Sequence, residues 1–115
     1  MQAKEMVKAA YEALEEKKGE DIRIIDISEI TTIADYFIIA AGGSNSQVSA
    51  LMDNVQEKLG RLGYEPKRIE GARTLNWVLM DYGDIIVHIF MREDRLFYDL
   101  ERIWKDGKNV EPEEI

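Results

Sequence analysis

Residues 34–41 form an apolar run that constrains the fold of this chain more than any other feature. They read Ala-Asp-Tyr-Phe-Ile-Ile-Ala-Ala, with apolar side chains at both odd and even positions. A strand with two apolar faces is typical of the centre of a sheet that is covered on both sides. Gly42-Gly43-Ser44 ends the run, and Ser44 or Ser46 is a suitable N-cap for a following helix. The sequence therefore predicts a central strand that turns directly into a helix.

The rest of the chain alternates between helical and strand periodicity. Apolar residues recur at helical spacing in three segments, residues 3–17, 48–62 and 96–104. Gly19 and Gly63 are suited to end the first two of these helices. Four further strands are predicted at residues 22–27, 66–70, 76–80 and 85–90. The order α-β-β-α-β-β-β-α predicts an α+β fold, in which helices flank a mixed β-sheet that contains a β-α-β crossover.

The length and composition of the chain are those of one ordinary domain. Its 115 residues are predicted to form a single domain over residues 1–107 and an acidic, flexible tail over residues 108–115. There is no cysteine, no apolar run long enough to cross a bilayer and no signal-peptide pattern, so we expect a cytoplasmic protein. The net charge of −8 argues against a dedicated nucleic-acid site. Acidity suits a basic protein partner, although it also keeps an ordinary domain soluble.

The hairpin predicted at residues 76–90 has a second face that is also rich in apolar groups. A turn at Asp81-Tyr82-Gly83-Asp84 pairs Met80 with Ile85 and Trp77 with His88. One face is then purely aliphatic and consists of Val78, Met80, Ile85, Val87 and Ile89. The other mixes large apolar with polar side chains, namely Trp77, Leu79, Asp81, Asp84, Ile86, His88 and Phe90. This mixture is typical of a protein–protein interface, but a helix on this face would make Trp77 an ordinary core residue.

No arrangement of side chains in the sequence predicts catalysis, a metal site or a cofactor. His88 is the only histidine, and a lone histidine in a strand is usually a packed residue. Gly42-Gly43-Ser44 resembles the Gly-Ser loop of nucleotidyltransferase folds, which also need a pair of carboxylates on the next strand. The only Asp-x-Glu pair, Asp99 and Glu101, falls instead in the predicted last helix. The loop is therefore either a tight turn with a serine cap or a phosphate loop without its chemistry.

A series of short motifs lies between Ala34 and Trp104, as part of a resemblance that spans about residues 4–105. It comprises Ala34-Asp35-Tyr36-Phe37-Ile38, Gly43-Ser44, Gln47, Gly71, Trp77-Val78-Leu79, Asp81-Tyr82-Gly83-Asp84, Val87-His88-Ile89-Phe90, Arg95, Tyr98-Asp99-Leu100-Glu101 and Trp104. Each motif is weak by itself, but the ordered set is specific, and it resembles the ribosome silencing factor (Iojap) family. The resemblance implies a nucleotidyltransferase-like α+β fold without catalytic carboxylates, in a protein that is not an enzyme.

The resemblance also implies a partner and a mode of action. Members of the family bind the ribosomal protein numbered fourteen on the intersubunit face of the large ribosomal subunit. They block joining of the small subunit and lower translation when nutrients are short. Organellar relatives assist large-subunit assembly, and free members often form homodimers.

We therefore expect a homodimer when free, and on the ribosome a contact surface made of Trp77, Leu79, Asp81, Asp84, Ile86, His88, Tyr98 and Glu101. Trp77, Leu79 and Ile86 would serve as apolar anchors, and the aspartates would meet basic side chains. The alternatives are an assembly factor of the large subunit, a magnesium-dependent nucleotidyltransferase that uses Gly43 and Ser44, and a self-associating scaffold.

Overall fold

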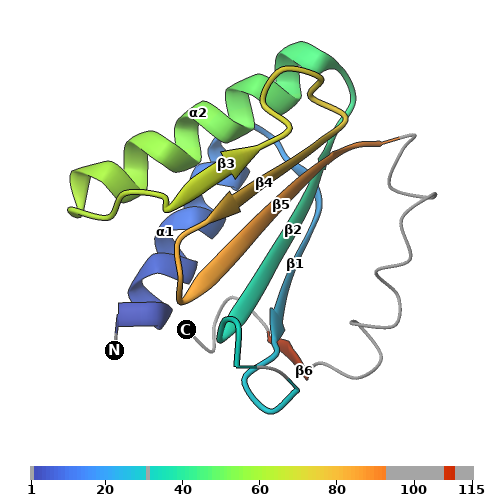
Figure 1. Cartoon of the computed structure of the whole chain (residues 1–115). Helices are drawn as coiled ribbons and strands as arrows, with labels where there is room; N and C mark the ends of the chain where they lie inside the picture. Colours follow the sequence, from blue (N-terminus) through green and yellow to red (C-terminus); the bar gives the residue numbers. More distant parts are fainter. Residues whose placement is uncertain (1, 31, 93–107, 111–115) are drawn as a thin grey trace.

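The computed structural model describes residues 2–30, 32–92 and 108–110, which form two helices and a sheet (Figure 1). In chain order the elements are α1 (Gln2–Glu16), β1 (Glu20–Asp26), β2 (Tyr36–Gly42), α2 (Asn45–Arg61), β3 (Arg68–Glu70), β4 (Trp77–Asp81), β5 (Ile85–Met91) and β6 (Lys108–Val110). The predicted helices and strands up to β5 are all present, with small differences in their boundaries. The helix predicted at residues 96–104 lies outside the described residues.

The strands of the described residues form one mixed sheet in the order β3-β4-β5-β2-β1-β6. β2 and β5 are parallel, with Ile38 paired with Val87, and the other neighbouring strands are antiparallel. The chain leaves β2 through α2 before it returns to the sheet, as the predicted crossover requires. The apolar run of residues 34–41 thus supplies a strand inside the sheet, and the predicted α+β class with a mixed sheet is confirmed.

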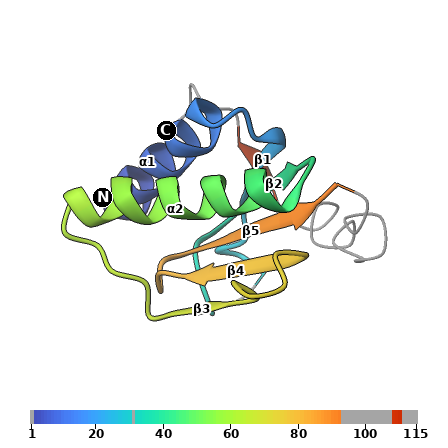
Figure 2. The same ribbon diagram turned by 90° about the horizontal axis from the view of Figure 1, so that it is seen from above.

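Both described helices pack on the same face of the sheet, as Figures 1 and 2 show. Their apolar stripes meet alternate side chains of the strands in a main core that includes Val7, Leu14, Leu51, Leu59, Ile38, Met80 and Val87. Ile25 and Ile39, which follow Ile24 and Ile38 in the strands, lie in a second apolar cluster instead. Because successive side chains of a strand point to opposite faces, this second cluster lies on the face turned away from α1 and α2.

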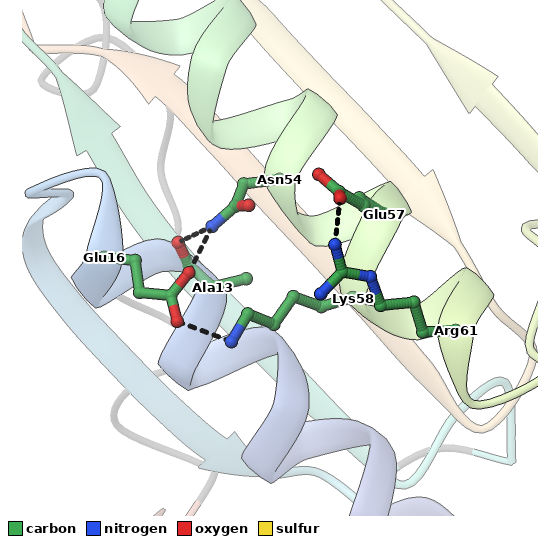
Figure 3. A network of polar contacts seen from close by, with 6 residues as sticks. All are labelled: Ala13, Glu16, Asn54, Glu57, Lys58 and Arg61. Carbon is green, nitrogen blue, oxygen red and sulfur yellow. Dashed lines mark hydrogen bonds and ion pairs between the residues drawn. The ribbon is translucent and has the colours of Figure 1, made fainter.

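A polar network joins α1 to α2 within their largely apolar contact (Figure 3). The buried amide of Asn54 donates to the Ala13 carbonyl at 2.8 Å and to the Glu16 carboxylate at 3.2 Å. Lys58 donates to the same carboxylate at 2.5 Å, and this hydrogen bond lowers the pKa of Glu16 below its ordinary value. Asn54 is thus a buried polar group whose hydrogen bonds connect the end of α1 with the middle of α2.

We expect Asn54→Ala to lower the free energy of unfolding by about 1–2 kcal/mol, because the Ala13 carbonyl loses its donor in a buried place. Urea unfolding followed by circular dichroism measures the change. Gln56→Ala is the matched control, since Gln56 is exposed on the same helix and the change should alter stability by less than about 0.5 kcal/mol. Equal effects of the two substitutions would contradict a structural role of the network.

The left-handed residue after α1 is Lys18, with φ +59, and not Gly19, which the sequence predicts to end the helix. The Gly19 amide donates to the Leu14 carbonyl at 2.8 Å. A Cβ on Gly19 would lie 3.1 Å from that carbonyl oxygen and 3.2 Å from Cδ2 of Leu51. Gly19 therefore allows a close approach between the end of α1 and α2, while Lys18 adopts the strained conformation.

Residues 108–110 belong to the sheet, whereas the sequence predicts a flexible tail from residue 108 onward. They form β6, antiparallel to β1, with Val110 opposite Ile24. Val110 is half-buried and packs against the main core. A three-residue strand has too little periodicity to be recognised in the sequence, and its pairing with β1 decides its conformation. The boundary predicted after residue 107 therefore needs correction for these three residues, and residues 111–115 lie outside the described ranges.

Candidate partner-binding surface

The hairpin of β4 and β5 has the predicted faces but a different register. Trp77 pairs with Phe90, whereas the sequence predicts its pairing with His88. The last hydrogen bond between β4 and β5 leaves only Gly83 and Asp84 in the hairpin loop. Gly83 has φ +87. A two-residue loop with a positive φ at its first position favours Gly there. The register prediction is thus wrong by two residues, but each side chain keeps its predicted face because side chains alternate with a period of two.

The two faces of the hairpin belong to different apolar clusters. The aliphatic face lies in the main core and consists of the buried side chains of Val78, Met80, Ile85, Val87 and Ile89. The other face belongs to the second cluster, which contains buried Ile25, Ile27, Ala34, Ile39, Ile86 and Phe90 and partly buried Phe37, Trp77 and Leu79. The prediction of a second apolar face is therefore confirmed. Phe37, which is not among the predicted contact residues, extends this face onto β2. The apolar run of residues 34–41 is the sequence signal from which Phe37 could have been predicted.

Trp77 and His88 form a polar contact inside the second cluster. Nε1 of Trp77 donates to Nδ1 of His88 at 3.1 Å. The Phe37 ring meets the His88 ring edge-on with centroids 4.8 Å apart, and the Phe90 ring stacks on Trp77 at 5.4 Å. Such aromatic pairs contribute about 0.5–1.5 kcal/mol beyond the burial of their area. The half-buried indole of Trp77 is therefore held in a single orientation.

His88 is uncharged at neutral pH and enclosed by its neighbours. Only 4% of the residue is exposed, and burial lowers the pKa of the imidazole from 6.5 to about 4. Because Nδ1 accepts the hydrogen bond of Trp77, the ring proton sits on Nε2. Nε2 is buried and has no hydrogen-bond partner among the described residues. The arrangement suits His88 to orient Trp77, not to meet a charged group of a partner.

Asp81 and Asp84 differ in how far their carboxylates are already engaged. The Asp81 carboxylate accepts from the Gly83 amide at 2.8 Å and lies 3.5 Å from the Arg68 guanidinium. The Asp84 residue is exposed, and its backbone carbonyl accepts the Asp35 amide at 2.8 Å. Asp81 therefore behaves as a turn aspartate that bonds to the backbone. Asp84 is the better placed of the two to meet a basic side chain of a partner.

The structure separates the predicted contact residues into an apolar end and an acidic end. Trp77 and Asp81 begin and end β4, so their Cα atoms are about 13 Å apart. Trp77 and Leu79 are partly exposed, whereas Ile86 and His88 are buried and offer little surface to a partner. The expected apolar anchors are thereby reduced from three to two, Trp77 and Leu79. The other two predicted contact residues, Tyr98 and Glu101, lie outside the described residues.

The Gly42-Gly43-Ser44 loop is filled by side chains of the protein itself. The Ser44 hydroxyl caps α2 by accepting from the Gln47 amide at 3.2 Å. The Gly43 amide donates to Oε1 of Gln47 at 2.7 Å, and a Cβ on Gly43 would lie 2.7 Å from the Arg92 guanidinium. Arg92 in turn bonds to the Glu20 carboxylate at 2.5 Å. The Gly43 amide, which would face a phosphate, is thus already engaged, and this favours the interpretation of a helix-capping turn.

The described ranges contain neither a cluster of metal ligands nor a membrane-spanning helix. No three His, Cys, Asp or Glu side chains gather there as a metal site needs. The strand after α2, where a nucleotidyltransferase carries its carboxylates, is β3 with the sequence Arg68-Ile69-Glu70. No helix in this part of the chain is long and apolar enough to span a bilayer.

Comparison with known protein families gives a match along the whole chain. The family model described as "Ribosomal silencing factor during starvation" matches residues 1–115. The chain belongs to this family. The resemblance inferred from the ordered motifs is thereby confirmed.

Individual relatives agree with the family match. The chain is 36% identical over 115 residues to the ribosomal silencing factor RsfS of Halalkalibacterium halodurans, and the match covers 100% of this chain and 98% of that protein. It is 42% identical over 108 residues to the RsfS of Chromobacterium violaceum, with 94% of this chain and 88% of that protein covered. A crystal structure of a Chromobacterium violaceum protein superimposes with a TM-score of 0.87 at 40% identity, over 96% of this chain and 92% of that one.

Proposed function

We propose that this protein silences ribosomes by occupying the large ribosomal subunit. It binds the ribosomal protein numbered fourteen on the intersubunit face, blocks joining of the small subunit and lowers translation in the cytoplasm when nutrients are short. The main support is the family match along residues 1–115. A relative that the chain matches over nearly its full length also carries the name ribosomal silencing factor. The filled Gly-Ser loop supports a role without nucleotidyl transfer.

The proposed mechanism is steric and needs no chemistry. The molecule measures 33 × 32 × 25 Å, whereas two surfaces in contact approach within about 4–4.5 Å. A bound domain of this size therefore keeps the two subunits apart wherever it sits between them. A specific complex needs about 800 Å² of contact on each partner, which a domain of this size can supply. The net charge of −8 favours approach to a basic ribosomal protein and disfavours bare RNA phosphates.

The proposed contact surface combines the accessible part of the second apolar face with the hairpin turn. Trp77 and Leu79 supply apolar contacts, and Asp84 supplies a carboxylate for a Lys or Arg of the partner. Because His88 and the surrounding rings hold Trp77 in one orientation, little side-chain entropy is lost when the partner binds. Added salt should weaken the complex, since it screens the carboxylates. Tyr98 and Glu101 complete the proposed contact.

We expect Leu79→Glu to weaken binding to the large subunit about tenfold or more, because it places a charge on the apolar contact. Trp77→Ala should act in the same direction by removing an aromatic anchor. Sedimentation binding with purified large subunits measures both effects. Leu62→Glu is the control, since Leu62 is exposed at the end of α2 and lies outside the proposed contact. Normal binding of folded Leu79→Glu and Trp77→Ala proteins would rule out this contact surface.

A sucrose gradient of purified ribosomal subunits tests the proposed function as a whole. The protein is added at a magnesium concentration that permits joining. We expect co-migration with the large subunit and loss of the joined particle. Co-migration without loss of joining would instead support a role in large-subunit assembly. Absence of co-migration would refute the proposed function and leave the fold unaffected.

We also propose that the free protein forms a homodimer through the same apolar contact. Trp77 and Leu79 are partly exposed apolar side chains, and apolar surface on a small domain favours self-association. Dimer and ribosome would then compete for Trp77 and Leu79. Light scattering of the free protein should give twice the mass of one chain, and Leu79→Glu should reduce it to the mass of a monomer.

A further inference from the structure

The loop between β1 and β2 has an inner and an outer apolar side. Ile27 and Ala34 are buried in the second cluster, whereas Ile30 and Ile33 are 48% and 72% exposed. In the described part of the chain, Leu62 is the only other large apolar residue that is exposed. Two of the three exposed large apolar residues therefore occupy one loop. The proposed contact of the hairpin does not use them.

Hydrogen bonds hold this loop against the end of the sheet. The Ile27 amide donates to the Asp35 carbonyl at 2.9 Å, which closes the loop at its base. The Asp26 carboxylate accepts from the amide of Ser28 at 2.9 Å and from its hydroxyl at 2.6 Å. The Asp35 amide donates to the Asp84 carbonyl at 2.8 Å and so ties the loop to the hairpin turn at the same end of the sheet (Figure 1). A loop held in this way loses little conformational entropy when a partner binds.

The loop is acidic as well as apolar. Between Arg23 and Lys58 the sequence contains no Lys, Arg or His. Glu29 precedes the exposed isoleucines and Asp35 follows them, and the exposed Asp84 is joined to Asp35 through the backbone. Three carboxylates thus accompany two exposed apolar side chains at one end of the sheet.

Two other carboxylates at this end of the sheet already have partners. Asp81 lies 3.5 Å from the Arg68 guanidinium, and the Asp26 carboxylate accepts from the amide and the hydroxyl of Ser28. Lys67 lies beside the hairpin turn, where a Cβ on Gly83 would be 3.2 Å from its Nζ. Asp26 and Asp81 are therefore not counted in the surface.

We propose that Glu29, Ile30, Ile33, Asp35 and Asp84 form a second docking surface, the acidic loop surface, for a protein whose apolar patch is surrounded by Lys and Arg side chains. The two isoleucines enter the apolar patch, and the three carboxylates pair with the surrounding cations. The same carboxylates repel nucleic-acid phosphates, so the partner is a protein and not RNA. This inference rests on the proposed function, because it assigns the partner to the basic proteins of the large subunit.

The acidic loop surface is continuous with the hairpin contact at Asp84. Leu79 and Trp77 lie further along β4 from the turn that carries Asp84. A partner that contacts the hairpin and the loop together would meet apolar groups from two separate segments of the chain. Such a divided contact predicts that substitutions in the loop weaken binding even when β4 is unchanged.

The test compares loop variants with matched controls for binding to purified large ribosomal subunits. We expect the double variant Ile30→Ser with Ile33→Ser, and separately Glu29→Lys, to weaken binding about tenfold or more. Leu62→Ser controls for loss of an apolar group, since Leu62 is 48% exposed, as Ile30 is. Asp53→Lys controls for the change of charge at an exposed position of α2. Thermal unfolding should be nearly unchanged in all four variants, because the substituted side chains are exposed.

The outcomes separate the acidic loop surface from the proposed function. If wild-type protein binds and the loop variants bind as the controls do, the acidic loop surface is refuted and the proposed function stands. If wild-type protein does not bind large subunits, both are refuted. Protein-free large-subunit RNA is the second probe, and wild-type binding to it that is lost in the loop variants would identify RNA as the partner and overturn the inference.

Discussion

Gly71→Ala is expected to lower the free energy of unfolding by about 4 kcal/mol, which is a large effect for a single methyl group. Gly71 has φ +82, and a Cβ at this position would lie 1.9 Å from the carbonyl oxygen of Trp77. The obstacle is backbone, so it cannot rotate away as the end of a flexible side chain can. Relief requires the start of β4 to move, and this would disturb the strand that carries Trp77 and Leu79.

Gly63→Ala is the matched control for Gly71→Ala. Gly63 also has a positive φ, of +92, but a Cβ there would have no atom within 4 Å. It should therefore cost only the backbone strain of a left-handed Ala, about 1 kcal/mol. Urea unfolding of the three proteins measures the difference. A loss of stability that is equal in the two variants would contradict the close approach of Gly71 to Trp77.

The second large effect is a loss of stability at acid pH that depends on His88. The pKa of His88 is about 4 in the folded protein and about 6.5 in the unfolded chain, because burial disfavours the charged imidazole. Between these two values the unfolded chain binds more protons, so protonation favours unfolding. The contribution is fully present above pH 6.5 and is lost as the pH falls towards 4. It amounts to about 3 kcal/mol in total, at 1.36 kcal/mol for each pKa unit.

The acid effect is measured as a difference between wild-type protein and His88→Gln. Gln does not titrate, and its amide oxygen can accept the hydrogen bond that Trp77 now gives to His88. Carboxylates titrate in both proteins and cancel in the comparison. Urea unfolding at pH 7 and pH 4.5 should show that wild-type protein loses about 2–3 kcal/mol more than His88→Gln. Parallel losses in the two proteins would show that His88 titrates normally and is not enclosed.

At acid pH, His88 should affect binding to the large subunit only through its effect on the stability of the fold. His88 lies within the second apolar cluster and orients Trp77, and it does not itself offer a charge to a partner. Within the pH range where the protein stays folded, protonation of His88 should therefore leave the affinity for the large subunit unchanged.

The family, the class of fold and the faces of the strands follow from the sequence alone. The ordered motifs identified the family, because many weak matches in a fixed order are jointly specific. The period of two in β4 and β5 assigned each side chain to a face, and a register error of two residues left this assignment unchanged. The Gly-Ser turn and its two candidate caps were also visible, and the structure selected Ser44.

The register, β6 and the accessible part of the site depend instead on contacts between distant segments of the folded chain. The register depends on which loop residue has the positive φ, and a single glycine in Asp81-Tyr82-Gly83-Asp84 fits more than one loop. β6 exists because β1 offers an edge, which the local sequence of residues 108–110 does not reveal. Burial of Ile86 and His88 and exposure of Ile30 and Ile33 depend on what packs over each face. Periodicity reports which side of a strand a residue occupies, but contacts between distant segments decide whether that side meets solvent.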